Sequence, residues 1–288
     1  MNPPPAPSPV KTSLSIGVAL GGGGARGIAH IAFLEALDEL GITPAAVSGA
    51  SIGAIIGAAY CAGVEAKLLR EHVLEVVGAR RSVMGKLLRA RVGRFADLLR
   101  GALANPILLD AEIFLEMFWP EDMPRRFEGL AIPFQTVAAD FHNRSEMILS
   151  SGPLAPAVAG SMAMPGLIKP VQLDGHLLVD GGAVNPLPYD LLFDRADIVI
   201  AVDVTFGALR GRKDPRPFET MFGAAQIMQG AITAQKLKTR PPDMLIRPPV
   251  QQFRVLEFLR AAQILRACDL AKDDFKRALG KTIEARLK

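Results

Sequence analysis

The segment Gly49-Ala50-Ser51-Ile52-Gly53 constrains the possible folds of this chain more than any other part of it. It reads G-x-S-x-G, it follows a short apolar run from Ala45 to Val47, and a helix-forming stretch from Ala54 to Ala62 comes next. Glycines two positions either side of a serine let the backbone bend sharply between a strand and a helix, where the hydroxyl is held exposed as a nucleophile. The pattern also arises by chance in a chain rich in glycine and alanine, so its weight depends on two companions, Gly21 to Gly27 and Asp180-Gly181-Gly182.

The order of elements along the chain predicts an α/β fold whose mainly parallel sheet is covered by helices. Ser13 to Leu20 is β-like and ends at the glycine cluster. Ile28 to Leu40 has helical periodicity, and Gly41 is placed to end that helix. The tail from Val255 has the pattern of an amphipathic helix. Further short strands are expected at Phe134 to Ala139, Leu177 to Val179 (after a tight turn at Asp174-Gly175), Ile198 to Val204 and Met244 to Arg247.

Composition narrows the kinds of site that the chain can hold. Half of its 288 residues are apolar, which is enough for a large buried core. Cys61 and Cys268 lie in apolar helical patterns and are interpreted as small core residues, and the four histidines lack the spacing of ligands, so no metal site is expected. The net charge of +4 suits an anionic lipid surface or an anionic substrate, and no nucleic-acid partner is expected.

Two segments bear on location. Residues 1–11 are proline-rich with no basic region before an apolar run, so we expect a disordered tail rather than a signal peptide, and a cytoplasmic protein. Leu40 to Val64 carries no charge and is long enough to suggest a transmembrane helix. Because Pro44, Ser48 and Gly49 interrupt this run, a strand, a turn and a buried helix are favoured over a membrane span.

A basic segment stands out in the first third of the chain. Lys67 to Arg100, within an expected helical segment 67–104, holds nine basic residues against three acidic ones, with leucine and valine between them. Two interpretations are open. The segment is a solvated helical face, or it is a mobile cap that touches anionic lipid headgroups beside the active site.

The glycine loop Gly22-Gly23-Gly24-Ala25-Arg26-Gly27 also has two interpretations. It fits G-x-G-x-x-G, the fingerprint of dinucleotide binding, which requires an acidic residue at the end of the second strand. Pro44 to Ser51 has no Asp or Glu, so the partner of the ribose is missing. Backbone amides freed by glycine at the start of a helix can instead stabilise an oxyanion, and the nearby serine favours this interpretation. Arg26 either adds positive charge near that oxyanion or braces the loop.

A serine nucleophile needs a base, and histidine is scarce where the α/β-hydrolase order would require it. No histidine follows His176, which lies beside a turn and is interpreted as exposed, and His30 is expected at a helix surface or half-buried. The remaining candidate is a carboxylate acting directly. Asp180 ends an apolar strand, and Gly181 and Gly182 would let it approach Ser51, although an Asp-Gly turn cap would look the same.

Several ordered blocks of the chain together resemble the patatin-like phospholipases, and most closely the short bacterial type. Besides Gly22 to Gly27, Gly49 to Gly53 and Asp180 to Gly182, the segments Ser161 to Gly166 and Leu178 to Pro188 are similar to the family's S-x-x-x-P-G block and to the run around its catalytic aspartate. The resemblance covers roughly residues 13–250. Ala50 departs from the family pattern, in which many members have threonine or cysteine, and the basic segment has no clear counterpart.

The resemblance implies a single domain, residues 12–288, of three layers α/β/α with a patatin-like fold. It implies a serine hydrolase of glycerolipid acyl esters, with Ser51 as nucleophile, Asp180 as base, and the loop from Gly22 to Gly27 as oxyanion hole. Gly49, Gly53, Gly181 and Gly182 support these groups, and no cofactor is required. The partner would be a lipid, with peripheral contact to an anionic membrane; the oligomeric state is open. The alternatives are a non-catalytic membrane-surface or regulatory module, and a dinucleotide-binding protein.

Overall fold

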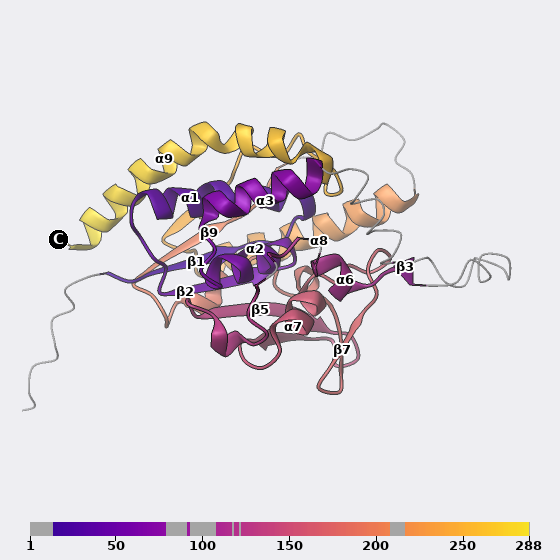
Figure 1. Ribbon diagram of the computed structural model, residues 1–288. Helices are drawn as coiled ribbons and strands as arrows, with labels where there is room; N and C mark the ends of the chain where they lie inside the picture. Colours follow the sequence, from indigo (N-terminus) through magenta and orange to yellow (C-terminus); the bar gives the residue numbers. More distant parts are fainter. Residues whose placement is uncertain are drawn as a thin grey trace, which may run out of the picture.

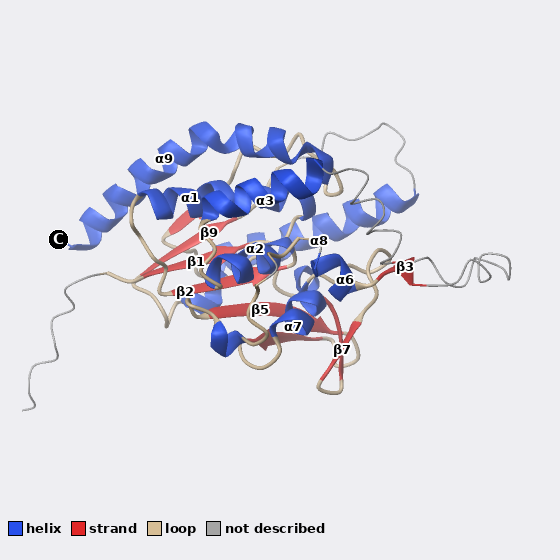
Figure 2. Cartoon of the chain, in the orientation of Figure 1, coloured by secondary structure: helices blue, strands red, loops and turns tan. Residues whose placement is uncertain are grey.

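The computed structural model describes residues 14–78, 91–92, 108–116, 118–120, 122–207 and 217–287. Within these ranges the chain forms three layers, with helices on both faces of one mixed sheet (Figures 1 and 2). The tail expected at residues 1–11 lies outside the described residues.

Five neighbouring strands are parallel, in the order β10-β9-β1-β2-β5, which confirms the expected α/β class. Two antiparallel strands, β8 and β7, continue the sheet, and β6 pairs with the other edge of β5. A separate small sheet joins β3 (Arg91–Val92) to β4 (Leu108–Leu109). The strands of the main sheet are β1 (Ile16–Leu20), β2 (Ala46–Ala50), β5 (Phe134–Asp140), β6 (Ser145–Leu149), β7 (Val171–Leu173), β8 (His176–Asp180), β9 (Ile198–Val202) and β10 (Met244–Ile246).

Alternate residues of the central strands enter two cores on opposite faces of the sheet, because successive side chains of a strand point to opposite sides. Ile16, Val18 and Leu20 of β1 belong to the larger core, whereas Ala19 packs in a smaller core with Tyr189. The larger core is covered by η1 (Gly24–Ala29), α1 (His30–Glu39), α2 (Ile52–Cys61), α3 (Ala66–Gly78), α6 (Ala111–Glu116), η2 (Phe127–Gly129), α7 (Leu154–Ser161) and α9 (Ala261–Leu287). The opposite face carries η4 (Tyr189–Leu192) and α8 (Pro217–Thr239).

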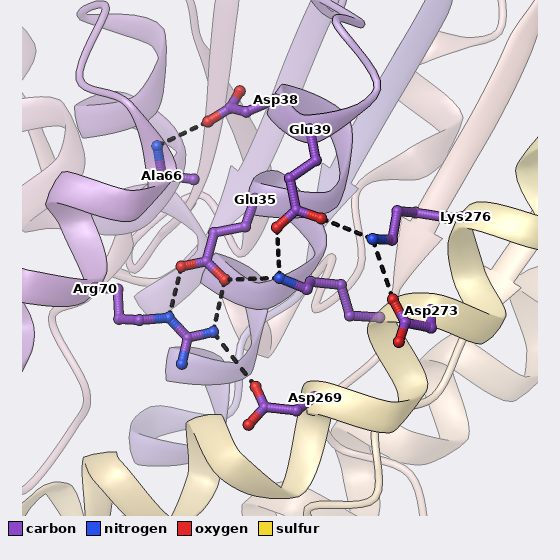
Figure 3. Close-up of polar contacts among 9 residues, drawn as sticks. Glu35, Asp38, Glu39, Ala66, Arg70, Asp269, Asp273 and Lys276 are labelled. Carbon is purple, nitrogen blue, oxygen red and sulfur yellow. Dashed lines mark hydrogen bonds and ion pairs between the residues drawn. The ribbon is translucent and has the colours of Figure 1, made fainter.

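Helices α1, α3 and α9 lie side by side and are joined by a network of ion pairs (Figures 1 and 3). Glu35 of α1 accepts from the Arg70 side chain of α3, with Nε 2.5 Å from Oε1. Glu39 of α1 pairs with Lys272 and Lys276 of α9 at 2.6 and 2.7 Å. The network ties the C-terminal helix to α1 and α3.

Most expected elements are present within a few residues of their predicted bounds. The helix expected at Ile28 to Leu40 is formed by η1 and α1, and Gly41 ends it with φ of 66°. The C-terminal helix begins at Ala261 rather than Val255, because Phe258–Arg260 forms a separate short turn, η5. Helices α7 and α8 and strands β6 and β7 were not expected from the sequence.

The basic segment 67–104 is described only in part. Ala66–Gly78 is a helix, as expected, but Arg91–Val92 forms a strand instead of helix because it pairs with Leu108–Leu109. The rest of the segment, including the cap interpretation that depends on it, lies outside the described residues. Within the described ranges, no helix is long and apolar enough to span a membrane.

Candidate active site

The register of the sheet brings the ends of β2 and β8 together. β2 runs parallel to β5, with Ala50 opposite Val137, and β8 runs antiparallel to β5, with Asp180 opposite Ala138. Since β6 occupies the other edge of β5 along the same residues, β2 and β8 lie on one edge and run towards each other. Their carboxyl ends therefore meet at neighbouring residues of β5. This meeting point places Ser51, which follows β2, beside Asp180, which ends β8.

Ser51 has a strained backbone between β2 and α2. Its φ is 54° and its ψ is −122°, in a region that residues other than glycine seldom occupy. The two flanking glycines are needed because the chain approaches itself closely here. A Cβ at Gly53 would lie 2.1 Å from the carbonyl oxygen of Leu20, and one at Gly49 would lie 2.5 Å from that of Gly53. The geometry is that of a nucleophile elbow.

The Ser51 hydroxyl donates a hydrogen bond to Asp180, with 2.7 Å between Oγ and Oδ2. The other carboxylate oxygen of Asp180 accepts from the amide of Gly182 at 2.7 Å. Asp180 is 4% exposed, and in the described ranges no cationic side chain pairs with it. Burial raises the pKa of Asp180 to about 6, against the opposing effect of the hydrogen bonds from Ser51 and Gly182.

Glycines 181 and 182 allow this arrangement. A Cβ at Gly181 would lie 2.0 Å from the carbonyl oxygen of Val137, so the chain after Asp180 passes directly against β5. At Gly182 a Cβ would lie 2.8 Å from Oδ1 of Asp180. Side chains at these positions would displace the carboxylate from the serine.

The glycine loop lies over Ser51, since a Cβ at Gly22 would lie 3.4 Å from the Cβ of Ser51. Its amides are not equivalent. The amide of Gly22 donates to Pro186 and that of Ala25 donates to the carbonyl of Val255. In the part of the chain that the structure describes, the amides of Gly23 and Gly24 have no such partner. Of the six loop residues expected to form an oxyanion hole, these two have amides that remain available to a ligand.

Arg26 and Gly27 hold the loop in place. The Arg26 guanidinium is buried, and its Nε donates to the carbonyl of Phe253 at 2.8 Å. A Cβ at Gly27 would lie 2.2 Å from Ile52, so the loop packs directly on the first turn of α2. The contact with Phe253 corresponds to the bracing role that the sequence left open for Arg26.

No histidine contacts Ser51 in the described residues. His176 begins β8, at the opposite end of that strand from Asp180, and its Nδ1 lies 2.5 Å from Oδ2 of Asp140. His30 is fully buried, which corrects the expected helix-surface or half-buried position. Its Nε2 lies 2.8 Å from the carbonyl oxygen of Gly21, and burial lowers its pKa to about 4. The neutral ring therefore acts on the start of the glycine loop, not on the serine.

Two further features of the site were missed by sequence reasoning. The Oγ of Ser161 accepts a hydrogen bond from the amide of Ser51 at 2.9 Å, which fixes the elbow. An apolar pocket with about 460 Å³ of empty space, its open mouth included, lies against Ser51. It is lined mostly by aliphatic, methionine and phenylalanine side chains, among them Ile52, Ile55, Phe118, Met162, Leu167 and Phe258. Ser161 is the first residue of the S-x-x-x-P-G block. The sequence pattern therefore pointed to this residue, but it did not predict the hydrogen bond to the amide of Ser51.

Within the described ranges, no three His, Cys, Asp or Glu side chains gather in a way that could hold a metal ion. Cys61 and Cys268 are buried and unpaired thiols in the larger core.

Comparisons with known proteins agree on one family. The family described as patatin-like phospholipase matches residues 18–193. An uncharacterized NTE family protein of Mycobacterium tuberculosis is 33% identical over 218 residues, which are 75% of this chain and 56% of that protein. The neuropathy target esterase sws of Drosophila melanogaster is 35% identical over 196 residues, covering 67% of this chain and 13% of the esterase. The chain thus spans little more than half the length of the mycobacterial relative.

The fold has solved counterparts. Human GIVD cytosolic phospholipase A2 superposes with a TM-score of 0.50 at 14% sequence identity, over 95% of this chain and 60% of that one. This likeness concerns the fold alone. The match of the family over residues 18–193, together with the relatives that are 33% and 35% identical, shows that the chain belongs to the patatin-like phospholipase family.

Proposed function

We propose that this protein is a serine hydrolase of acyl esters of glycerolipids, with Ser51 as nucleophile and Asp180 as base. One observation carries the proposal. A serine in a strained elbow donates to a buried carboxylate at 2.7 Å, and that carboxylate has no cationic partner in the described ranges. The names of its relatives, which include an esterase, agree with this reaction class.

In the first step the Ser51 oxygen attacks the ester carbonyl while Asp180 accepts the hydroxyl proton. The amides of Gly23 and Gly24 are the donors available to the oxyanion that forms. Asp180 then returns the proton to the leaving alcohol, which breaks the ester bond and leaves an acyl group on Ser51. A water molecule, deprotonated by Asp180, attacks this acyl group in turn, the bond to Ser51 breaks, the fatty acid leaves, and Asp180 returns the proton to the serine oxygen. The pKa of about 6 makes Asp180 a better base than an exposed aspartate while keeping it ionised at neutral pH.

The substrate class follows from the pocket beside Ser51. Its described lining is almost wholly apolar, so it suits a fatty acyl chain, and no described residue of the lining is charged and able to hold a polar acyl group. The acyl group would lie between α2 and the loop before α9, with its carbonyl at Ser51. A phospholipid or lysophospholipid meets this requirement.

The further expectations of the sequence stay proposals. We take residues 12–288 as one hydrolase domain, acting in the cytoplasm with peripheral contact to an anionic membrane. The dinucleotide alternative requires an acidic residue at the end of the second strand, where it would bind the ribose. In this chain the residue after β2 is Ser51, which does not favour that alternative. The alternative of a non-catalytic surface module predicts no turnover by purified protein.

The test is hydrolysis of a short-chain nitrophenyl ester and of a phospholipid by purified wild type, Ser51→Ala and, as a matched control, Ser150→Ala. Ser150 is exposed and lies away from the pocket. We expect wild type and Ser150→Ala to be equally active and Ser51→Ala to lose nearly all activity while keeping its circular dichroism. Residual turnover by Ser51→Ala above a few per cent would place the nucleophile elsewhere, and inactivity of folded wild type on all esters would favour the non-catalytic module.

A further inference from the structure

A second pocket lies behind the glycine loop, and the described residues that line it are separate from those of the Ser51 pocket. It holds about 1000 Å³ of empty space, its open mouth included. Its walls come from Arg26 of η1, from Asp203 and Thr205 after β9, from Arg247 after β10 and from Thr233 of α8. These elements meet beyond the carboxyl ends of parallel strands, the edge at which open α/β sheets bind ligands.

Three buried polar atoms on the walls of this pocket lack a hydrogen-bond partner in the described part of the chain. They are Nη2 of Arg26, Nε2 of Gln226 and Oγ1 of Thr233. Arg26 is 1% exposed and Thr233 is 3% exposed, so bulk water does not replace the missing partners. A buried donor without an acceptor costs on the order of 1–3 kcal/mol, and a charged one costs more. Three such atoms on residues that line one pocket single it out as a place where an acceptor would gain hydrogen bonds.

The charge of the pocket indicates what kind of acceptor fits. Within the described residues, no carboxylate lies within ion-pair distance of the Arg26 guanidinium, whose Nε donates to the neutral carbonyl of Phe253. Burial lowers the pKa of Arg26, and the charge of Glu257, farther away, opposes this effect in part. Arg247 adds a second guanidinium, and Asp203, 3.5 Å from its Nε, is the single carboxylate among the described lining residues. Buried charges are normally paired, so an excess of one cation favours an anionic ligand.

We propose that this pocket is a second binding site, which takes a small ligand through its phosphate group, held by Arg26, Gln226 and Thr233. Guanidinium, amide and hydroxyl donors are the groups that bind phosphate oxygens in proteins, and three separate donors suit a group with several acceptor oxygens. The site is distinct from ester hydrolysis, because Ser51 and Asp180 are absent from its lining.

The site is connected to the Ser51 pocket through Arg26. The same side chain that would hold the phosphate donates to Phe253, and the neighbouring amide of Ala25 donates to Val255. Val255 lines the Ser51 pocket, as does Gly24. A phosphate bound to Arg26 would therefore fix the loop from Phe253 to Val255, which forms one wall of the acyl pocket.

The test is calorimetric titration of inorganic phosphate into the purified full chain. We expect saturable binding to wild type and about tenfold weaker binding to Thr233→Val, which removes one donor to an anion at nearly constant shape. Thr239→Val is the matched control, because Thr239 is exposed on the same helix and outside the pocket, and its affinity should equal that of wild type. Gln226→Leu should repeat the loss.

Binding that is absent from wild type, or equal in Thr233→Val and Thr239→Val, would overturn the proposal, as would acetate that competes as well as phosphate. Two further competitors distinguish the source of the phosphate. Displacement by glycerophosphocholine is expected for a lipid headgroup, and displacement by glycerol 3-phosphate alone is expected for a free phosphate monoester. Ser51→Ala should bind phosphate as wild type does, so the outcome is independent of whether Ser51 is the nucleophile.

Discussion

Glu35 and Asp180 are both buried carboxylates, 7% and 4% exposed, but their surroundings are opposite. Glu35 lies between α1, α3 and α9, where Arg70 contacts both of its oxygens (Figure 3). Lys272 lies 3.6 Å from the same carboxylate. Asp180 lies at the end of β8 with a hydroxyl and one amide as its hydrogen-bond donors. The buried carboxylate of Glu35 therefore has cationic partners, whereas within the described ranges that of Asp180 has none.

This difference in surroundings distinguishes a carboxylate with a structural role, Glu35, from one that is suited to accept a proton, Asp180. Arg70 and Lys272 pair with the Glu35 carboxylate and join three helices through it, which is a structural role. Asp180 lacks such partners in the described ranges, so its desolvation raises its pKa to about 6 and makes it more basic. Because the folded state then binds this proton more tightly than the unfolded chain does, the contribution of Asp180 to the free energy of unfolding falls as the pH rises from about 4 to 6.

Replacement of Asp180 should have the largest effect on the rate of ester hydrolysis. In Asp180→Asn, Ser51 has no base, and kcat should fall by about 10³ to 10⁴. Removing a charge whose burial costs about 3 kcal/mol at neutral pH should leave the variant at least as stable as wild type. Ester hydrolysis and thermal melting at pH 7 measure both effects.

The double variant Ser51→Ala/Asp180→Asn is the control for this prediction. It should be about as inactive as either single variant, since the two groups act as a unit. Loss of activity in Asp180→Asn with an equal loss of stability would instead make Asp180 a structural residue like Glu35.

The next largest effect is expected in the glycine loop. A Cβ at Gly24 would lie 2.4 Å from Val255, so Gly24→Ala should shift the free amides and lower kcat by about 10² to 10³ with little change in KM. Gly41→Ala is the matched control. Gly41 also has positive φ but nothing lies within 4 Å, and its substitution should cost stability without affecting kcat. A change confined to KM in Gly24→Ala would identify a substrate-binding loop.

The pH dependence of activity gives a smaller, graded effect. If Asp180 must be ionised, kcat/KM should fall about tenfold for each pH unit below about 6 and should level off above it. A profile of kcat/KM from pH 4 to 8 checks this, with His176→Ala as control. An unchanged profile in His176→Ala is expected, and disappearance of the inflection in that variant would restore a histidine as base.

Replacement of Glu35 should have the opposite effects to replacement of Asp180: a loss of stability with little change in the rate of hydrolysis. Glu35→Gln leaves Arg70 and Lys272 with a neutral partner, so we expect a loss of about 1–3 kcal/mol in the free energy of unfolding. The rate of ester hydrolysis should remain within about twofold of wild type, because Glu35 does not line the Ser51 pocket. Urea denaturation followed by circular dichroism measures the first quantity. A severe loss of kcat in protein that is still folded would contradict the separation of the two regions.

Local patterns predicted much of the site because local geometry fixes it. Gly49 and Gly53 are required by the close passage of the chain around Ser51, and the absence of a later histidine led directly to Asp180. The structure has the two side chains 2.7 Å apart. Their roles as nucleophile and base stay predictions until they are measured.

What the sequence did not predict depends on contacts between distant segments. The antiparallel pairing of β8 with β5 brings Asp180 to the end of β2, and nothing near either residue specifies it. Ser161 and His30 act on backbone groups through tertiary contacts, so their patterns resemble an ordinary helix. Helix α8 was missed because Gly223 and Gly230 interrupt a sequence with no apolar stripe.

Fluorophosphonate labelling followed by mass spectrometry tests the central claim most directly, because the reagent reacts only with an activated serine. The account predicts that wild type is modified at Ser51, and that Asp180→Asn is modified at least about a hundredfold more slowly at pH 7, since it retains the elbow but lacks the base. Labelling of Asp180→Asn at the wild-type rate, or modification of a serine other than Ser51, would contradict it.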